Sequence, residues 1–373
     1  MEKITPFIVM DILKKAREMP DAVHMEVGEP DLPPSPRVED AFVKAIRDRR
    51  FFYTSACGLW ELRKKISEHY LKTYNVDVSP ERIIITPGTS GAFLIVLALF
   101  VERGKRLILS DPSYPCYKNF AYFLGIEPYF IPVEKETNYE IMPEMIKNID
   151  NIGALMVSSP ANPTGNLYKV DTLRKLVEFC KEHKIWLISD EIYHGLVYDE
   201  KEFTALDFSQ DAIVINGFSK YFCMPGFRLG WVIFPEDFVR KAEILIQNIF
   251  IAASTPAQYA ALEAFDYKYL EIVKNTFRER RNLLYAELKD IFEISLKPEG
   301  AFYIWTDISR YEDDSVRFCN LLLEKKAVAV TPGVDFGRNK TDRYVRFAYT
   351  TNISHLREGV RRIREFVQDI SFK

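Results

Sequence analysis

The hydrophobic pattern of the chain changes its period several times, and each change marks an element of secondary structure. From Arg82 to Asn216, short apolar runs rich in β-branched residues alternate with longer stretches whose apolar positions recur at helical spacing. Parallel strands need a long crossover between them, usually a helix, so this order predicts an α/β fold with a mostly parallel sheet covered by helices on both faces. The expected strands are residues 82–86, 106–110, 127–132, 153–159, 185–189 and 212–216.

The two ends of the chain follow a different pattern. Apolar positions at helical spacing predict an N-terminal helical arm at residues 7–18, and the proline-rich segment 28–36 then interrupts regular structure. A long charged helix that ends near residue 293 is expected to connect the sheet to a smaller α+β unit. The remaining predicted elements are helices at 36–48, 59–74, 314–326 and 354–369 and strand-like runs at 300–309, 328–332 and 344–350.

The composition is that of a folded protein whose ligands are small. The 373 residues are 47% hydrophobic and 28% charged, which leaves no room for extensive disorder, and the length suggests about two or three domains. Lysine and arginine number 50 against 53 aspartates and glutamates, which gives a net charge of −3. Such a small net charge creates no strong field, so neither nucleic acid nor an anionic membrane is expected as the main partner.

The cysteines and the N-terminal segment indicate a cytoplasmic protein. The five cysteines are odd in number and include no CxxC pair, so we expect reduced thiols and no metal site. Charged residues interrupt the apolar positions of residues 1–18, so neither a signal peptide nor a membrane span is expected there. The longest apolar run, Ala92 to Val101, is too short to cross a bilayer and is expected to form a buried helix.

Lys220 is the first candidate for chemistry in the sequence. It lies in the segment 216–231, after an apolar strand and between Phe218 and Tyr221. Apolar neighbours favour the neutral amine, a nucleophile able to form a Schiff base with a carbonyl. Arg228, eight positions later, offers a guanidinium fork that suits phosphate. The pair fits a phosphorylated aldehyde such as pyridoxal phosphate, although a surface lysine and a salt-bridged arginine explain this stretch alone equally well.

Other polar residues follow the predicted strands at their carboxyl ends, where ligands of open parallel sheets bind. The glycine turn 88–91, which contains Thr89 and Ser90, leads into a helix and presents N–H groups and hydroxyls to an anion. An aromatic ring at a strand end can stack on a planar heterocycle, and a carboxylate there needs a charged or donor partner such as a pyridinium. The residues at the other strand ends are Tyr114, Asn162, Asp190 and Tyr193.

Each candidate also has an ordinary structural explanation. The turn 88–91 caps a helix, Asn162 belongs to a turn between prolines, and Asp190 serves equally well as a helix N-cap. Tyr53 is either a packing residue or a hydroxyl aimed into a site. Gly28 lets the backbone approach a ligand closely, or simply stands in a common turn. The gathering of so many candidates at strand ends is what favours a single cofactor site.

The motifs and their order resemble the class I aminotransferases, which are pyridoxal-phosphate enzymes of fold type I. The matching segments span nearly the whole chain and are GEPD, Tyr53, GTSGA, DPSY, NPTG, SDEIY, FSKYFCMPGFRLG and VRFAYTT. The resemblance implies a large domain with a mostly parallel sheet of the seven-stranded type, a small α+β domain from both chain ends, and a homodimer. We expect the arm and part of the small domain at 1–45, the pyridoxal-phosphate domain at 46–280 and the C-terminal small domain at 281–373.

The same resemblance implies a role for each matching residue. Lys220 would hold the cofactor as an internal aldimine and move the proton at the substrate Cα, while Asp190 would keep the pyridine nitrogen protonated. Tyr193 and Asn162 would hydrogen-bond the ring oxygen, and Arg346 would clamp the substrate α-carboxylate. The remaining contacts would come from Gly28 at the carboxylate, Tyr114 on the ring and, at the phosphate, Thr89, Ser90, Ser219, Arg228 and Tyr53 of the partner subunit.

Departures from the family pattern bear on the phosphate site and on specificity. Gly217 stands where many relatives have a serine or threonine, so this phosphate contact is lost or passes to Ser219. Ser90 stands where some aspartate-using members have a lysine, and the arm is apolar at residues 7–9 where some have small or hydroxyl residues. A buried distal carboxylate would find no partner here, so we expect apolar or aromatic amino acids to be used at least as well as aspartate.

The sequence favours a transaminase that exchanges an α-amino group between an L-amino acid and a 2-oxo acid in a ping-pong cycle. A C–S β-lyase on the same scaffold is the alternative, because both reactions begin with loss of the same Cα proton. A pyridoxal-phosphate-sensing regulator is disfavoured. Its DNA-binding helix-turn-helix would have to precede the first motif at Gly28, and the charge balance gives no basic face.

Overall fold

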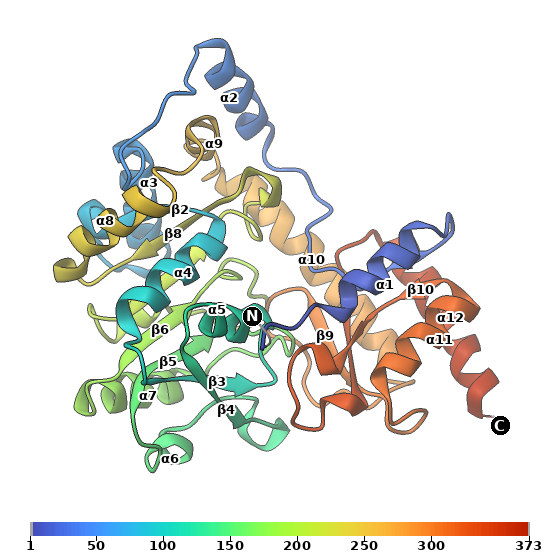
Figure 1. The fold of residues 1–373 in the computed structure, drawn as a ribbon. Helices are drawn as coiled ribbons and strands as arrows, with labels where there is room; N and C mark the ends of the chain where they lie inside the picture. Colours follow the sequence, from blue (N-terminus) through green and yellow to red (C-terminus); the bar gives the residue numbers. More distant parts are fainter. Residues whose placement is uncertain (1–2, 372–373) are drawn as a thin grey trace.

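The computed structural model of the protein describes residues 3–371 and has a seven-stranded sheet at its centre (Figure 1). The strand order is β2-β8-β7-β6-β5-β3-β4. β8 runs antiparallel to both of its neighbours, and the other strands pair in parallel. The strands are β2 (Ile83–Pro87), β3 (Arg106–Asp111), β4 (Glu127–Pro132), β5 (Ile152–Ser158), β6 (Trp186–Asp190), β7 (Ile213–Gly217) and β8 (Leu229–Ile233).

Strand β8 is the one strand of this sheet that the hydrophobic pattern did not predict. Each of the other six begins and ends within one residue of its predicted position. β8 directly follows Arg228, and all of its residues are buried. It returns antiparallel to β7 through a loop without a crossover helix, so the alternation of strands and helices gave no indication of it.

Helices cover both faces of the sheet because its strands are apolar on both sides. Neighbouring residues of a strand enter separate cores: Ile83 and Ile85 pack into one and Ile84 into the other. The predicted buried helix at 92–101 is confirmed in α4, which begins earlier, at Gly88. The helices of this part are α2 (Pro36–Arg47), α3 (Trp60–Tyr74), α4 (Gly88–Phe100), α5 (Cys116–Phe123), α6 (Pro143–Ile146), α7 (Val170–Glu182), α8 (Val239–Ile249) and α9 (Thr255–Ala261).

A smaller unit is built from both ends of the chain (Figure 1). The connecting helix α10 (Tyr267–Leu288) ends earlier than the expected residue 293 and leads to a three-stranded antiparallel sheet of order β11-β12-β9. Buried residues of the N-terminal helix share one core with those of α10 and the C-terminal helices. The other elements are α1 (Ile8–Arg17), β1 (Val23–His24), β9 (Tyr303–Asp307), α11 (Ser315–Lys326), β10 (Val328–Ala329), β11 (Thr331–Pro332), β12 (Tyr344–Ala348) and α12 (Ile353–Ser371).

The described part of the chain lacks two features that would change its class. None of the helices within residues 3–371 is long and apolar enough to cross a membrane. In the same range, no cluster of three or more histidine, cysteine, aspartate or glutamate side chains is arranged to hold a metal ion. All five cysteines belong to this range and are free thiols, four of them buried.

The packing of α10 yields a first prediction. Phe277 is fully buried, and its ring centroid lies 5.4 Å from that of Phe302. We expect Phe277→Ala to lower the free energy of unfolding by about 3–5 kcal/mol, because the cavity it leaves fills only in part. Ile272→Ala on the same helix, where the side chain is 62% exposed, should change it by less than about 0.5 kcal/mol. Urea unfolding followed by circular dichroism measures both, and equal values for the two variants would contradict the packing.

Candidate active site

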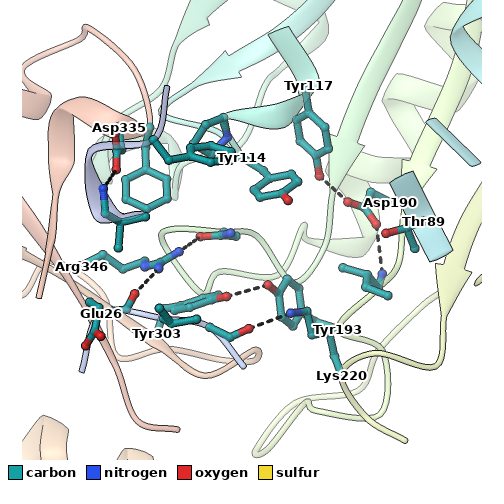
Figure 2. A pocket seen from close by; sticks show the side chains of 18 of the residues that line it. Glu26, Thr89, Tyr114, Tyr117, Asp190, Tyr193, Lys220, Tyr303, Asp335 and Arg346 are labelled. Carbon is teal, nitrogen blue, oxygen red and sulfur yellow. Dashed lines mark hydrogen bonds between the residues drawn. The ribbon is translucent and has the colours of Figure 1, made fainter. Parts of the chain in front are cut away.

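Most of the residues predicted at strand ends line one cavity of about 220 Å³ (Figure 2). The cavity receives side chains from the large sheet, from the smaller unit and from the N-terminal arm. It therefore lies where the two chain ends meet the carboxyl ends of the parallel strands, as expected for ligands of an open α/β sheet. The predicted site residues that line it are Gly28, Thr89, Tyr114, Asn162, Asp190, Tyr193, Lys220 and Arg346.

Lys220 follows β7 and extends into this cavity. Its Nζ donates a hydrogen bond of 2.7 Å to the carbonyl oxygen of Gly28 and lies 5.7 Å from the ring centroid of Phe302. Burial, and then the positive charge of Arg346, lower the pKa of Lys220 to about 8. At pH 7 roughly a tenth of the molecules therefore carry the neutral, nucleophilic amine.

Asp190 ends β6 and is buried with its carboxylate at the cavity. The carboxylate accepts hydrogen bonds from the Tyr117 hydroxyl and, at 3.2 Å, from the backbone N–H of Ile192 (Figure 2). Burial raises the pKa of Asp190 to about 6, and the bond from Tyr117 opposes this rise. The N–H contact closes a turn and does not cap a helix, because no helix begins between Asp190 and Ala205. The carboxylate also reaches the cavity, where a cation brought against it would stabilise its charge.

Arg346 on β12 is buried, and none of its hydrogen-bond partners among the described residues is an anion. Its guanidinium donates to Asn162 Oδ1 at 2.8 Å, to the carbonyl oxygen of Glu26 at 2.7 Å and to the Thr331 hydroxyl at 3.3 Å. The guanidinium carbon lies 4.1 Å from the ring centroid of Tyr303. Nε is buried and has no hydrogen-bond partner within residues 3–371. A buried charge that contacts only neutral acceptors is costly, so this arrangement favours an incoming anion.

Tyr117 and Tyr303 are site residues that the sequence did not reveal. Tyr303 lies in β9, and its hydroxyl is 2.8 Å from that of Tyr193. A Cβ added to Gly28 would lie 1.7 Å from the Tyr303 oxygen, so the packing of this tyrosine leaves no room for a side chain at Gly28. Tyr117 lies in the first turn of α5, after the proline-rich turn that contains Tyr114, and no local pattern of the sequence indicated its contact with Asp190.

Four predicted phosphate ligands do not line the cavity. Ser90 and Arg228 are exposed, Ser219 is buried next to Lys220 without lining the cavity, and Tyr53 is 78% exposed. Arg228 nevertheless lies against the start of α4, since a Cβ added to Gly88 would be 2.7 Å from its nearest guanidinium nitrogen. The first N–H groups of α4 and the Arg228 guanidinium thus surround one small region beside Thr89.

The cavity also has an apolar wall that belongs to the N-terminal arm. Phe7, Val9 and Met10 line it from the arm, and Phe93 and Phe336 line it from the two units. The only lysine and arginine side chains among its lining residues are Lys220 and Arg346. The arrangement can therefore bind one carboxylate at Arg346, present an amine at Lys220 and hold a planar heterocycle between Tyr114 and Asp190.

Comparison with known proteins places this arrangement in a family. The model of the class I and II aminotransferases matches residues 20–363. The chain belongs to this family. It is 37% identical to the (5-formylfuran-3-yl)methyl phosphate transaminase of Methanocaldococcus jannaschii, over 97% of this chain and 96% of that relative. It is 34% identical to the valine–pyruvate aminotransferase of Mycobacterium tuberculosis, over 96% of each chain.

The fold of this aminotransferase agrees with solved structures. It matches the aspartate aminotransferase of Thermus thermophilus with maleate at a TM-score of 0.92 and 29% identity, over 98% of this chain and 97% of that one. The enzyme is therefore a transferase of the pyridoxal-phosphate-dependent aminotransferase family, as its motifs predicted. The expected mostly parallel seven-stranded sheet is confirmed.

The lowered pKa of Lys220 predicts the pH dependence of its reactivity. Only the neutral amine is a nucleophile, so in protein freed of cofactor its reductive methylation by formaldehyde and cyanoborohydride should accelerate about tenfold per pH unit up to about pH 8 and then level off. Peptide mass spectrometry between pH 6 and pH 9.5 measures this rate. Labelling of the exposed Lys64, measured in the same digest, is the control for any change in the reactivity of the reagent itself with pH. A tenfold rise that continues beyond pH 9 would contradict the lowered pKa.

Proposed function

We propose that this aminotransferase binds pyridoxal phosphate in the cavity and exchanges an α-amino group between an L-amino acid and a 2-oxo acid in a ping-pong cycle. One observation carries the proposal: Lys220, Asp190 and the anion-free guanidinium of Arg346 line the same cavity. They supply the nucleophile, the counter-ion for a protonated heterocycle and the carboxylate site that the reaction needs.

The residues of the cavity fit this cofactor at both of its ends. The buried carboxylate of Asp190 has only neutral donors and suits a pyridinium N–H, beside the ring of Tyr114. The start of α4 at Gly88 suits the phosphate, because helix N-termini bind anions and Arg228 lies against this turn. We assign the phosphate to Thr89, Ser90, Ser219 and Arg228, and the ring oxygen to Tyr193 and Asn162.

Pyridoxal phosphate supplies an electron sink that stabilises negative charge at the substrate Cα. Lys220 then accepts the Cα proton and returns it, and its pKa of about 8 keeps both forms of the amine accessible near neutral pH. Asp190 keeps the pyridine nitrogen protonated. Arg346, fixed by Asn162 and by the carbonyl of Glu26, orients the α-carboxylate so that the Cα proton faces Lys220.

The site is best completed by a second copy of the chain. Phe51, Phe52 and Tyr53 are 54%, 75% and 78% exposed, and adjoining aromatic side chains at such exposure are typical of an interface. We propose a cytoplasmic homodimer in which Tyr53 reaches the phosphate of the partner subunit. We propose the division into 1–45, 46–280 and 281–373. The core that α1 shares with α10 to α12 supports a small domain that contains both chain ends.

The apolar wall supports a preference among amino donors. A side-chain carboxylate placed against Phe7, Val9 and Phe336 would meet no cation once Arg346 holds the α-carboxylate. An apolar or aromatic side chain gains from the same contact. We propose that phenylalanine and leucine are used at least as well as aspartate.

Incubation with an amino donor alone tests the reaction type. Protein loaded with pyridoxal phosphate should form pyridoxamine phosphate in an amount equal to its active sites, whereas pyruvate and ammonia from a cysteine-type donor would indicate a β-lyase instead. Borohydride should fix the cofactor to Lys220 in the unmodified protein. Lys220→Ala should abolish turnover, and Lys64→Ala on the exposed face of α3 is the control. A reduced adduct on another lysine would overturn the assignment.

Arg346→Lys tests the carboxylate site together with the donor preference. An ammonium cannot reproduce the guanidinium fork, so kcat/KM should fall about 10- to 100-fold for every donor alike, measured with phenylalanine, leucine and aspartate. A loss confined to one donor would contradict the role of Arg346. Wild-type kcat/KM for aspartate about a hundredfold above that for phenylalanine and leucine would contradict the apolar wall and leave Arg346 unaffected.

A further inference from the structure

We propose that Asp335 determines substrate specificity by fixing the N-terminal arm as the apolar wall of the cavity and by adding a negative charge to its lining. The inference rests on the proposed function, because it concerns the donors of the same site. Asp335 follows β11 and is far from the arm in sequence, so no motif joins them. It does not contact the predicted cofactor ligands by any hydrogen bond that the structure describes, and its role is distinct from theirs.

The contact between Asp335 and the arm uses both carboxylate oxygens. Oδ1 accepts the backbone N–H of Ile8 and Oδ2 accepts that of Val9, each at 2.9 Å. Figure 2 shows the carboxylate directed at this backbone at the edge of the cavity. The Asp335 side chain is buried and lines the cavity itself. Two charge-assisted bonds in water-excluded surroundings are strong, so they hold the arm in one position.

The arm needs this contact because its helix has no N-cap of its own. α1 begins at Ile8, and the first N–H groups of a helix lack intrahelical partners. Phe7 occupies the N-cap position and makes no capping hydrogen bond with its side chain. An isolated helix of 10 residues is marginal in water. Asp335 therefore supplies the missing cap, and its charge also suits the positive end of the helix dipole.

The turn that Asp335 holds is the part of the arm that lines the cavity. Further along α1, Ile12 and Ala16 are buried in the core of the smaller unit and hold that end of the helix. Phe7, Val9 and Met10 lie in the first turn and line the cavity. The other side-chain hydrogen bonds of the arm join Lys3 to Glu127, Thr5 to Asn119 and Lys15 to Asn320, and all of them are exposed and contribute little.

The negative charge of Asp335 disfavours donors with an acidic side chain, as the apolar wall of the arm also does. Both carboxylate oxygens of Asp335 already accept N–H groups of the arm, and Arg346 and Lys118 act on the carboxylate electrostatically without a hydrogen bond that the structure describes. A donor with an acidic side chain would bring a further negative charge against Asp335, into a cavity of about 220 Å³ whose lining also includes Glu26 and Asp190. An aromatic or aliphatic donor brings none and gains contact with Phe7 and Val9.

Asp335→Asn tests the inference, since the amide keeps the shape but loses the charge and one of the two acceptors. We expect kcat/KM for phenylalanine to fall roughly tenfold, mainly through KM, while that for aspartate changes by less than about threefold. The donor ratio, which is kcat/KM for phenylalanine divided by kcat/KM for aspartate, should therefore fall by about a factor of ten. Hydrogen exchange followed by mass spectrometry, on the cofactor-loaded enzyme without substrate, should show peptides covering residues 7–12 exchanging at least about tenfold faster.

Asp314→Asn is the matched control. Asp314 caps α11 from the N-cap position, its Oδ1 accepting the N–H groups of Val316 and Arg317 at 2.9 and 3.0 Å, and it does not line the cavity. Asparagine keeps this oxygen, so the control removes a charge at a helix start and should leave both the cap and the donor ratio unchanged. A donor ratio in Asp335→Asn equal to that of the control would overturn the specificity role. Unchanged exchange at residues 7–12 would overturn the contact role, whereas a wild-type enzyme inactive with every donor would overturn the proposed function itself.

Discussion

A buried guanidinium that hydrogen-bonds only neutral groups in the described part of the chain is the constraint on which the arrangement of this aminotransferase depends. Arg346 contacts an amide oxygen, a carbonyl oxygen and a hydroxyl, so its charge is solvated by dipoles and not neutralised. Keeping such a charge out of water costs stability, and the surrounding fold has to hold each dipole in place. The same charge lowers the pKa of Lys220, after burial, and so links the carboxylate site to the nucleophile.

The three acceptors around Arg346 come from distant parts of the chain. Asn162 follows a strand of the large sheet, Glu26 lies in the loop after β1, and Thr331 belongs to the small antiparallel sheet. The charge is therefore satisfied only when both chain ends are docked against the large sheet. This requirement explains why the connecting helix and the shared core of the smaller unit matter for chemistry as well as for stability.

The N-terminal arm is also held by a buried charge, but this charge is negative. Asp335 is a buried carboxylate whose hydrogen bonds go to backbone N–H groups of a segment at the other end of the chain. Each of the two buried charges thus joins the N-terminal residues to the C-terminal sheet, one at the carboxylate site and one at the apolar wall. The cavity between them is shaped by these contacts, since loops alone would leave its walls mobile.

The sequence by itself determined the strands, the helices around them and the residues at the strand ends, because period, turn chemistry and strand polarity are local properties. Lys220, Asp190 and Asn162 could be predicted in this way, and the order of the motifs gave the family. Tertiary structure alone decided the antiparallel strand β8, the bond from Tyr117 to Asp190, the place of Tyr303 against Gly28 and the cap that Asp335 gives to α1. These are contacts between residues far apart in the chain, or between side chains whose direction depends on packing, and no local pattern records them. The exposed position of Tyr53, outside the cavity of its own chain, likewise depends on tertiary packing and could not be predicted from a local pattern.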